Sequence, residues 1–113
     1  MNNWEEYSET ILIDDFSSKV LPEVYNHFFT PNEIQAYAHK RKKGSLAARY
    51  LIKRIIRSHF ESMVDYKDLE ILNADSGKPV LYSDKIDKEV LKRIHISLSH
   101  SQQEVAVFVI IEK

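Results

Sequence analysis

The chain has 113 residues, of which 43% are hydrophobic and 29% are charged, and its formal net charge is −1. These values are typical of one small globular domain, so we predict a single domain over residues 1–113, and a general nucleic-acid binder would be more basic. The sequence contains no cysteine, which excludes a disulfide framework, a thiolate metal site and a cysteine nucleophile.

The N-terminus gives no indication of targeting. Residues 1–9 are polar and acidic, and they lack the basic start and apolar run of a signal peptide. No apolar stretch approaches the roughly 18 residues that a membrane-spanning helix needs. We therefore expect a cytoplasmic location and no membrane partner.

A short strand and a helix are predicted at the start of the chain. Thr10–Ile13 is a β-favouring apolar run that ends at Asp14 and Asp15. Phe16–Phe28 has apolar residues at helical spacing, and Pro22 marks either a first turn or a kink in it.

Two further helices follow. Thr30 can cap a helix that begins at Pro31, because Glu33 stands where its side chain can reach back to the cap. This helix should run to about Lys43 and stop near the following glycine. Ser45–Met63 is the longest periodic segment, and its apolar residues can share one broad face.

The second half of the chain is rich in β-favouring residues. A turn is predicted at Asp75–Pro79 and a short helix at Ile86–Arg93. The predicted strands or extended segments are Asp68–Asn73, Val80–Tyr82, Ile94–Leu98 and Val105–Ile111, the last two as an antiparallel hairpin. This order of elements predicts the α+β fold class.

The longest predicted helix carries a stripe of cations. Arg49, Lys53 and Arg57 are four residues apart, so they lie on one helix face, where like charges cost roughly 0.2–0.5 kcal/mol per pair. The stripe is either a solvated face paired with acids or a phosphate-binding face, because guanidinium groups match phosphate oxygens. The basic run Lys40–Lys43 is either a soluble helix end, where cations suit the dipole, or a dock for phosphate or an acidic protein. The pattern alone favours the first for both.

Two other polar groups are candidate ligands. Adjacent side chains on a strand point to opposite faces, so Asp14 and Asp15 are not expected to chelate together. One of them can bind Mg²⁺ with substrate phosphates or can cap the following helix, which is the simpler interpretation. Ser97–Ser101 places three hydroxyls and the imidazole of His100 at a strand end, where they can surround an anion or form a turn.

Four segments together resemble the holo-acyl-carrier-protein synthase group of the 4′-phosphopantetheinyl transferase superfamily. LAARYLIK (46–53) is similar to the family's LAxRFxxKE, and LEILNADSGKP (69–79) to its IEIxNDxxGKP. IHISLSHS (94–101), followed by VAV (105–107), is similar to the HVSLSHxxxxAxAxV hairpin, and FTPNE (29–33) to FTxxE. The order and spacing of these motifs over residues 10–112 are more specific than any one of them.

The resemblance implies both a fold and an activity. It implies an α+β fold with a small antiparallel or mixed sheet packed on a long helix, commonly assembled as a homotrimer with coenzyme A bound between neighbouring subunits. It implies transfer of the 4′-phosphopantetheine arm of coenzyme A to a serine of an acyl carrier protein, with release of 3′,5′-ADP. The acceptor serine then belongs to the partner.

The resemblance also implies roles for individual residues. Asp14 matches the family's Mg²⁺-binding aspartate after the first strand, and Lys53 with its neighbour Arg54 falls at the catalytic positions of the helix. The residues that match coenzyme-binding positions are Arg49, Gly77, Lys78, Pro79, Ser99 and His100.

Two residues depart from the family pattern. The glycine before the metal-binding aspartate is Leu12 here, and the metal-binding glutamate after the helix lysine is Arg54. Arg54 can take over part of the cation's role, because an arginine stabilises phosphoryl charge directly. The alternative is a non-catalytic relative that binds coenzyme A, a carrier protein or a catalytic subunit. No nucleic-acid partner is expected.

Overall fold

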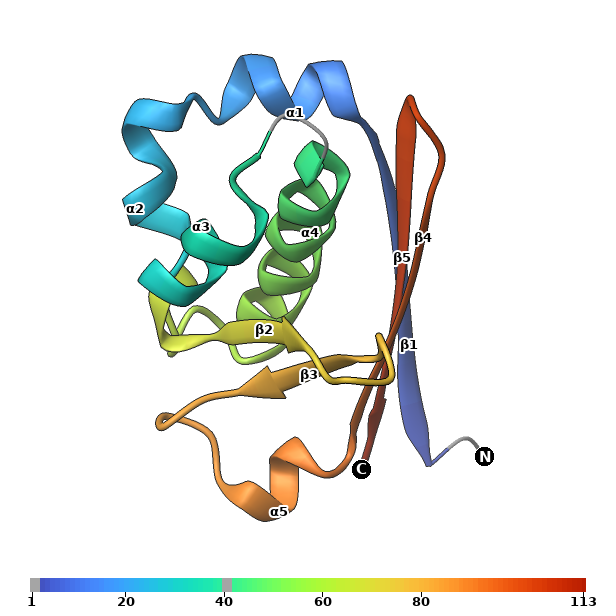
Figure 1. Cartoon of the computed structure of the whole chain (residues 1–113). Helices are drawn as coiled ribbons and strands as arrows, with labels where there is room; N and C mark the ends of the chain where they lie inside the picture. The colour runs from blue at the N-terminus through green and yellow to red at the C-terminus, as the bar shows by residue number, and fades with distance from the viewer. Residues whose placement is uncertain (1–2, 40–41) are drawn as a thin grey trace.

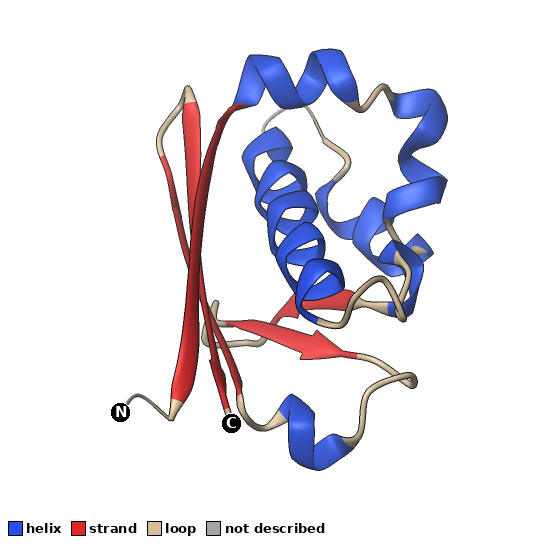
Figure 2. Cartoon of the chain, turned by 180° about the vertical axis from the view of Figure 1, so that it is seen from behind, coloured by secondary structure: helices blue, strands red, loops and turns tan. Residues whose placement is uncertain are grey.

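A long helix, α4 (Lys43–His59), packs against one face of a three-stranded antiparallel sheet (Figure 1). The sheet contains β1 (Trp4–Leu12), β5 (Glu104–Glu112) and β4 (Ile94–His100), with β5 in the centre. This computed structural model describes residues 3–39 and 42–113. From behind, Figure 2 shows the other helices and a small second sheet on the same side of the large sheet as α4.

The core forms between β5 and α4. Side chains alternate across a strand, and the inward positions of β5 are buried valine or isoleucine from Val105 to Ile111. The buried apolar side chains of α4 that face them are Leu46, Ala47, Ala48, Leu51, Ile52, Ile55 and Ile56. Each buried leucine or isoleucine contributes about 1.5–3 kcal/mol, so this interface supplies much of the stability.

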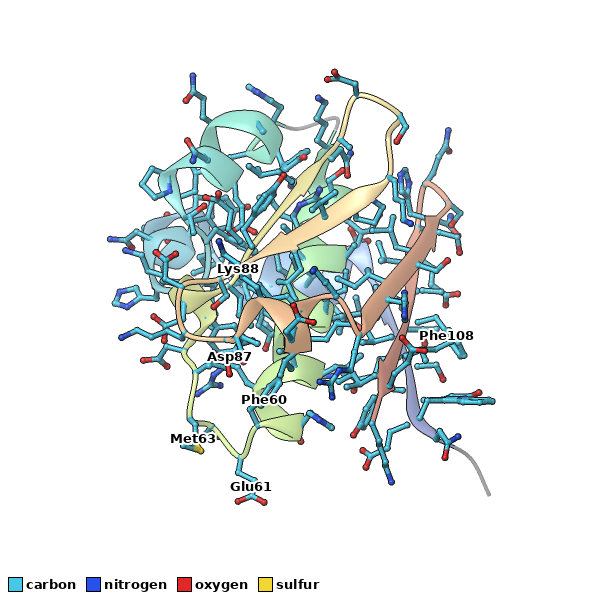
Figure 3. All side chains as sticks on the ribbon, turned by 90° about the horizontal axis from the view of Figure 1, so that it is seen from below. Phe60, Glu61, Met63, Asp87, Lys88 and Phe108 are labelled. Atoms are coloured by element: carbon cyan, nitrogen blue, oxygen red, sulfur yellow. The ribbon has the colours of Figure 1, made fainter. Side chains whose placement is uncertain are left out.

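The helix α4 ends earlier than predicted. Its last residue is His59, and the prediction that it continues to Met63 is wrong. Glu61 and Ser62 have φ angles of 54° and 64°, so the backbone leaves helical geometry there. Met63 is therefore 85% exposed, and Figure 3 shows it with Glu61 beyond the end of the helix.

The first strand is longer than the apolar run that predicted it. β1 extends back to Trp4 because its whole length pairs with β5, from Trp4 opposite Glu112 to Leu12 opposite Glu104. The next helix, α1 (Ile13–Lys19), begins directly after the strand.

The single helix predicted over Phe16–Phe28 is wrong. The segment instead forms α1, a 3-10 turn over Pro22–Val24 and the short helix α2 (Tyr25–Phe28). Pro22 is the first residue of the 3-10 turn, where the missing backbone N–H is tolerated. The proline thus ends one helix and starts the next element.

The capped helix begins as predicted. In α3 (Pro31–Tyr37) the Thr30 side chain accepts from the Glu33 N–H, and the Glu33 side chain accepts from the Thr30 N–H. α3 ends at Tyr37, so the prediction that it continues to Lys43 is wrong. Gly44 does not stop it but lies in the first turn of α4. Of the basic run, Lys40 and Arg41 lie outside the described residues.

The second half of the chain agrees closely with the predicted elements. β2 (Glu70–Asn73) and β3 (Pro79–Tyr82) form a separate antiparallel pair, preceded by a 3-10 turn over Tyr66–Asp68. The helix α5 (Lys88–Leu91) leads into the antiparallel β4–β5 hairpin, which is confirmed. None of the helices among residues 3–39 and 42–113 has the length and apolar character to cross a membrane.

Replacing Thr30 by valine tests the helix cap. Thr30 is 9% exposed, and its hydroxyl also donates to Glu70 at 2.5 Å. Thr30→Val keeps the side-chain volume but removes both contacts, so we expect unfolding in urea to show a loss of about 1–2 kcal/mol. Ser18→Ala removes an exposed hydroxyl from α1 and should cost less than about 0.5 kcal/mol. Equal losses would contradict this account of the cap.

Candidate functional site

A buried ion pair joins the middle of α4 to α3. The Nζ of Lys53 lies 2.5 Å from Oε1 of Glu33, and both side chains are fully buried. Lys53 also donates to the carbonyl of Phe28, and the second Glu33 oxygen accepts from the Ile71 N–H at 2.8 Å. Burial lowers the pKa of Lys53, while the Glu33 carboxylate opposes that shift.

Arg49 is buried one turn earlier on the same helix. Its Nε donates to the Ile71 carbonyl at 2.7 Å, and its Nη2 donates to the Asn73 side chain at 3.0 Å. The guanidinium lies 3.7 Å from the ring centre of Tyr37. Burial lowers the pKa of Arg49, and the charge of Glu33 opposes the effect.

The predicted stripe is therefore not an exposed face at its first two positions. Arg49 and Lys53 have 1% and 0% exposure, so neither the solvated interpretation nor an open phosphate-binding face is right for them in the single chain. Only Arg57 reaches the surface, where it pairs with Asp65 at 3.5 Å. The two buried cations instead fasten β2 to α4. The roles of Arg49 and Lys53 in binding coenzyme A stay predictions. Because both side chains are buried, they would affect a ligand by positioning β2.

Arg54 is the accessible cation of this part of α4. Its Nη2 lies 2.6 Å from Oε1 of Glu9 on β1, and the two side chains are 41% and 35% exposed. The guanidinium also lies 5.7 Å from the ring centre of Tyr50. The hydrogen bond to Glu9 raises the pKa of Arg54, so the group stays charged. No sequence motif pointed to Glu9 as a candidate functional residue.

Asp14 follows the first strand closely, in the first turn of α1. The N-cap of that helix is Leu12, so the capping role proposed for Asp14 or Asp15 is wrong. Both carboxylates are exposed and suit the positive end of the helix dipole.

The residues present do not fit a resident Mg²⁺ ion. Mg²⁺ binds carboxylate oxygens, but the second family ligand is the cation Arg54, which already neutralises Glu9. Among the described residues, no group of three or more histidine, aspartate or glutamate side chains could hold a metal ion.

A basic pocket lies where α4 begins. It has a volume of about 540 Å³ and is lined by Lys42, Lys43, Gly44 and His100, among others. A Cβ on Gly44 would lie 3.5 Å from the His100 ring, so this imidazole packs against the first turn of α4. Helix N-termini attract anions, and the lysines and the imidazole add donors to that end. The arrangement suits a phosphate group.

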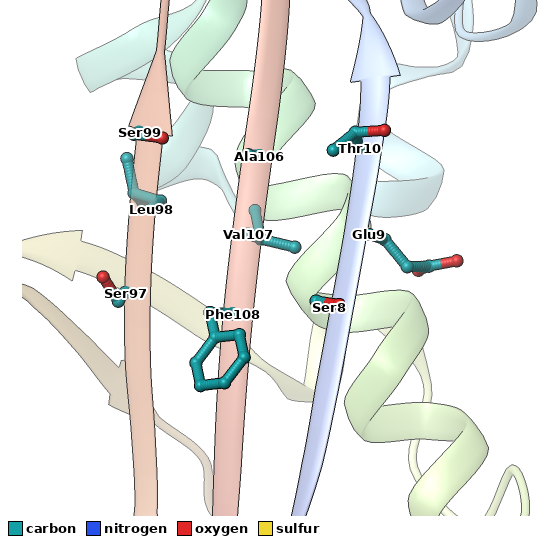
Figure 4. Close-up of a pocket in the computed structure, with 9 residues that line it drawn as sticks. All are labelled: Ser8, Glu9, Thr10, Ser97, Leu98, Ser99, Ala106, Val107 and Phe108. Carbon is teal, nitrogen blue, oxygen red and sulfur yellow. The ribbon is translucent and has the colours of Figure 1, made fainter.

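Ser99 faces a different direction from His100. Neighbouring side chains on a strand alternate, and Ser99 lines a hollow on the outer face of the large sheet with Ser97, Thr10 and Phe108 (Figure 4). Both residues also line a shallow hollow at the tip of the β4–β5 hairpin.

Gly77, Lys78 and Pro79 form the β2–β3 turn, as predicted. Gly77 has a φ of 88°, which favours glycine, and its N–H donates to the Ala74 carbonyl. Figure 1 places this turn beside the middle of the large sheet, far from the hairpin tip that carries His100. The predicted coenzyme residues of one chain therefore lie in two separate parts of the structure, the β2–β3 turn and the hairpin tip.

Replacing Lys53 tests the buried pair. Lys53→Met leaves the Glu33 carboxylate buried without its cation, so we expect a loss of about 3–5 kcal/mol in urea unfolding. The matched variant Arg57→Met, one turn later and partly exposed, should cost much less. The double variant Lys53→Met with Glu33→Gln should recover part of the loss, because it removes the unpaired charge. Similar losses for Lys53→Met and Arg57→Met would show that the pair is not special.

No protein-family model matches the chain, but named relatives do. The chain is 31% identical over 99 residues to a holo-acyl-carrier-protein synthase of Anoxybacillus flavithermus, covering 81% of the chain and 79% of the relative. It is 35% identical over 101 residues to the synthase of Clostridium botulinum, covering 80% of each.

A solved structure agrees in fold. The crystal structure of a holo-acyl-carrier-protein synthase from Bacillus anthracis in complex with CoA (3′,5′-ADP) matches with a TM-score of 0.76 and 23% identity, over 96% of this chain and 95% of that one. The α+β fold class is thus confirmed. With the sequence relatives, it follows that the chain belongs to the holo-acyl-carrier-protein synthase family.

Proposed function

We propose that this chain transfers the 4′-phosphopantetheine arm of coenzyme A to a serine of an acyl carrier protein and releases 3′,5′-ADP. The observation that carries the proposal is the basic pocket at the start of α4, in a chain whose relatives are holo-acyl-carrier-protein synthases. The pocket offers cations and helix N–H groups where a nucleotide phosphate needs them.

The reaction requires little covalent chemistry from the protein. The serine hydroxyl oxygen of the carrier attacks the pantetheine-bearing phosphorus of the coenzyme diphosphate. The bond from that phosphorus to the bridging oxygen breaks, 3′,5′-ADP leaves with the electron pair, and the serine proton passes to solvent or to a base. Catalysis then consists of positioning the two substrates and stabilising the charge on the diphosphate.

The pocket can hold a phosphate group of the nucleotide part of coenzyme A. Lys42 and Lys43 are exposed cations, and His100 is an exposed imidazole held against Gly44. Together they can bind phosphate oxygens, while Ser101, which lines the same pocket, adds a hydroxyl. Arg49 and Lys53 are positioning residues in this proposal, because they hold β2 and hence the turn Gly77–Pro79.

We further propose that coenzyme A binds between copies of the chain in a homotrimer. The turn Gly77–Pro79 lies beside the middle of the large sheet, whereas the basic pocket lies at the start of α4 near the hairpin tip (Figure 1). The outer face of the large sheet offers a surface for assembly, because Phe108 is 40% exposed there beside Ala106 and Ile110. A neighbouring copy on this face would bring its own elements beside the first.

Of the metal ligands that the resemblance implies, Asp14 alone is a carboxylate here, so a Mg²⁺ ion at Asp14 would take its other oxygens from the coenzyme diphosphate. A chain that binds coenzyme A without transferring the arm would be the non-catalytic relative, which the burial of Lys53 favours. The single domain over residues 1–113 and the cytoplasmic location stay predictions from the sequence.

The activity is tested with coenzyme A and several apo carrier proteins. We expect the intact mass of a carrier to rise by one phosphopantetheine group, with equimolar 3′,5′-ADP released. His100→Ala should lower the rate by roughly tenfold or more, because it removes a donor to the phosphates. His27→Ala removes an exposed imidazole from α2, away from the pocket and the large sheet, so it is the matched control and should keep the rate. No mass change in any carrier would refute the transfer.

The trimer is tested on the outer sheet face. Light scattering should give three times the chain mass for the unmodified protein. Phe108→Glu places a charge in the proposed interface and should yield monomers, whereas Tyr82→Glu alters an exposed ring on β3, outside that face, and should not. A monomeric unmodified protein, or a Phe108→Glu variant that stays trimeric, would contradict the interface.

A further inference from the structure

An accessible cation stands on α4 where the family pattern has a metal-binding carboxylate. Arg54 lines a hollow of about 440 Å³ between β1 and α4, together with Ser8, Glu9 and Ser58. Its guanidinium is fixed from two sides, by Glu9 at 2.6 Å and by the Tyr50 ring at 5.7 Å. The side chain is nevertheless 41% exposed, so part of the guanidinium faces solvent.

We propose that the pair of Arg54 and Glu9 replaces a divalent cation in this chain, so that coenzyme A is bound and used without a metal. This inference rests on the proposed function. Arg54 donates to the diphosphate of the coenzyme, and Glu9 is a positioning residue that holds the guanidinium in place.

The chemistry of the guanidinium suits this role. It carries more N–H donors than Glu9 can use, and its planar fork matches two phosphate oxygens at once. It also remains charged at every physiological pH, so its positive charge does not depend on binding a metal ion first. Glu9 and the Tyr50 ring restrict its motion, which reduces the entropy lost when a ligand binds.

The same contacts explain why a metal is disfavoured. A divalent ion at this place would lie next to a positive charge, and the nearest carboxylate, Glu9, is already bonded. The charge that a metal would bring is thus present in the chain itself. Replacing Arg54 by an acid reverses the situation, because two carboxylates would then face one another, and Mg²⁺ binds one or two carboxylates plus substrate phosphates.

The first experiment uses the unmodified protein. Calorimetric titration with coenzyme A is carried out in EDTA and in excess Mg²⁺, and the transfer rate is measured in both. We expect dissociation constants and rates that agree within about twofold. A tightening of tenfold or more by Mg²⁺ would overturn the inference and leave the proposed function intact. No binding of coenzyme A in either solution would overturn the proposed function itself.

The second experiment uses Arg54→Glu, with Lys92→Glu as the control. Lys92 is an exposed cation paired with Glu89, so its replacement makes the same change in net charge away from α4. In EDTA, Arg54→Glu should bind coenzyme A roughly 10- to 100-fold more weakly, and Mg²⁺ should restore much of the loss. Lys92→Glu should bind as the unmodified protein does in both solutions.

A readout independent of activity completes the test. Electron paramagnetic resonance of added Mn²⁺ should detect one bound ion in Arg54→Glu and none in the unmodified protein. If Arg54→Glu does not fold, as judged by circular dichroism, Arg54→Gln tests the loss of the cation alone and should weaken binding in EDTA. Coenzyme binding in EDTA that is unchanged by both replacements would overturn the role of Arg54.

Discussion

The contact between Lys53 and Glu33 joins α3, α4 and β2 inside the core. One buried carboxylate binds the ammonium group of α4, caps α3 through the Thr30 N–H and accepts from the Ile71 N–H on β2. Neither charge has access to water, so each is tolerable only because the other is present. The small sheet that carries the Gly77 turn therefore takes its position from an ion pair in the core rather than from apolar packing alone.

The surface carries its charges in a different arrangement. The cations near the start of α4 lie around an open pocket, whereas Arg54 is matched by an acid on the neighbouring strand. Every buried side-chain nitrogen and oxygen atom among the described residues has a hydrogen-bond partner, which places the free binding capacity of this part of the chain at its surface. In the proposed function, recognition of a phosphorylated ligand begins at surface groups, namely Lys42, Lys43, His100 and Arg54.

Local sequence patterns predicted the helices and strands better than they predicted how these elements pack together. The capping box at Thr30 and the β4–β5 hairpin depend on nearest neighbours, so the sequence was sufficient for both. The strand from Trp4 has polar, acidic residues and forms because β5 offers a pairing edge, which no local pattern reveals. Helical spacing placed Arg49 and Lys53 on one face, but only the packing of α3 and β2 decides that this face is internal. Glu9 lacked any motif, and its role follows from contact with Arg54 alone.

The distance between the β2–β3 turn and the hairpin tip has a consequence for regulation by concentration. In the proposed assembly, no isolated subunit holds a complete ligand site, so affinity for the coenzyme and affinity between subunits are thermodynamically linked. A ligand that binds only the assembled form stabilises it by mass action. Dilution would then weaken nucleotide binding, and a high nucleotide concentration would favour assembly of the subunits.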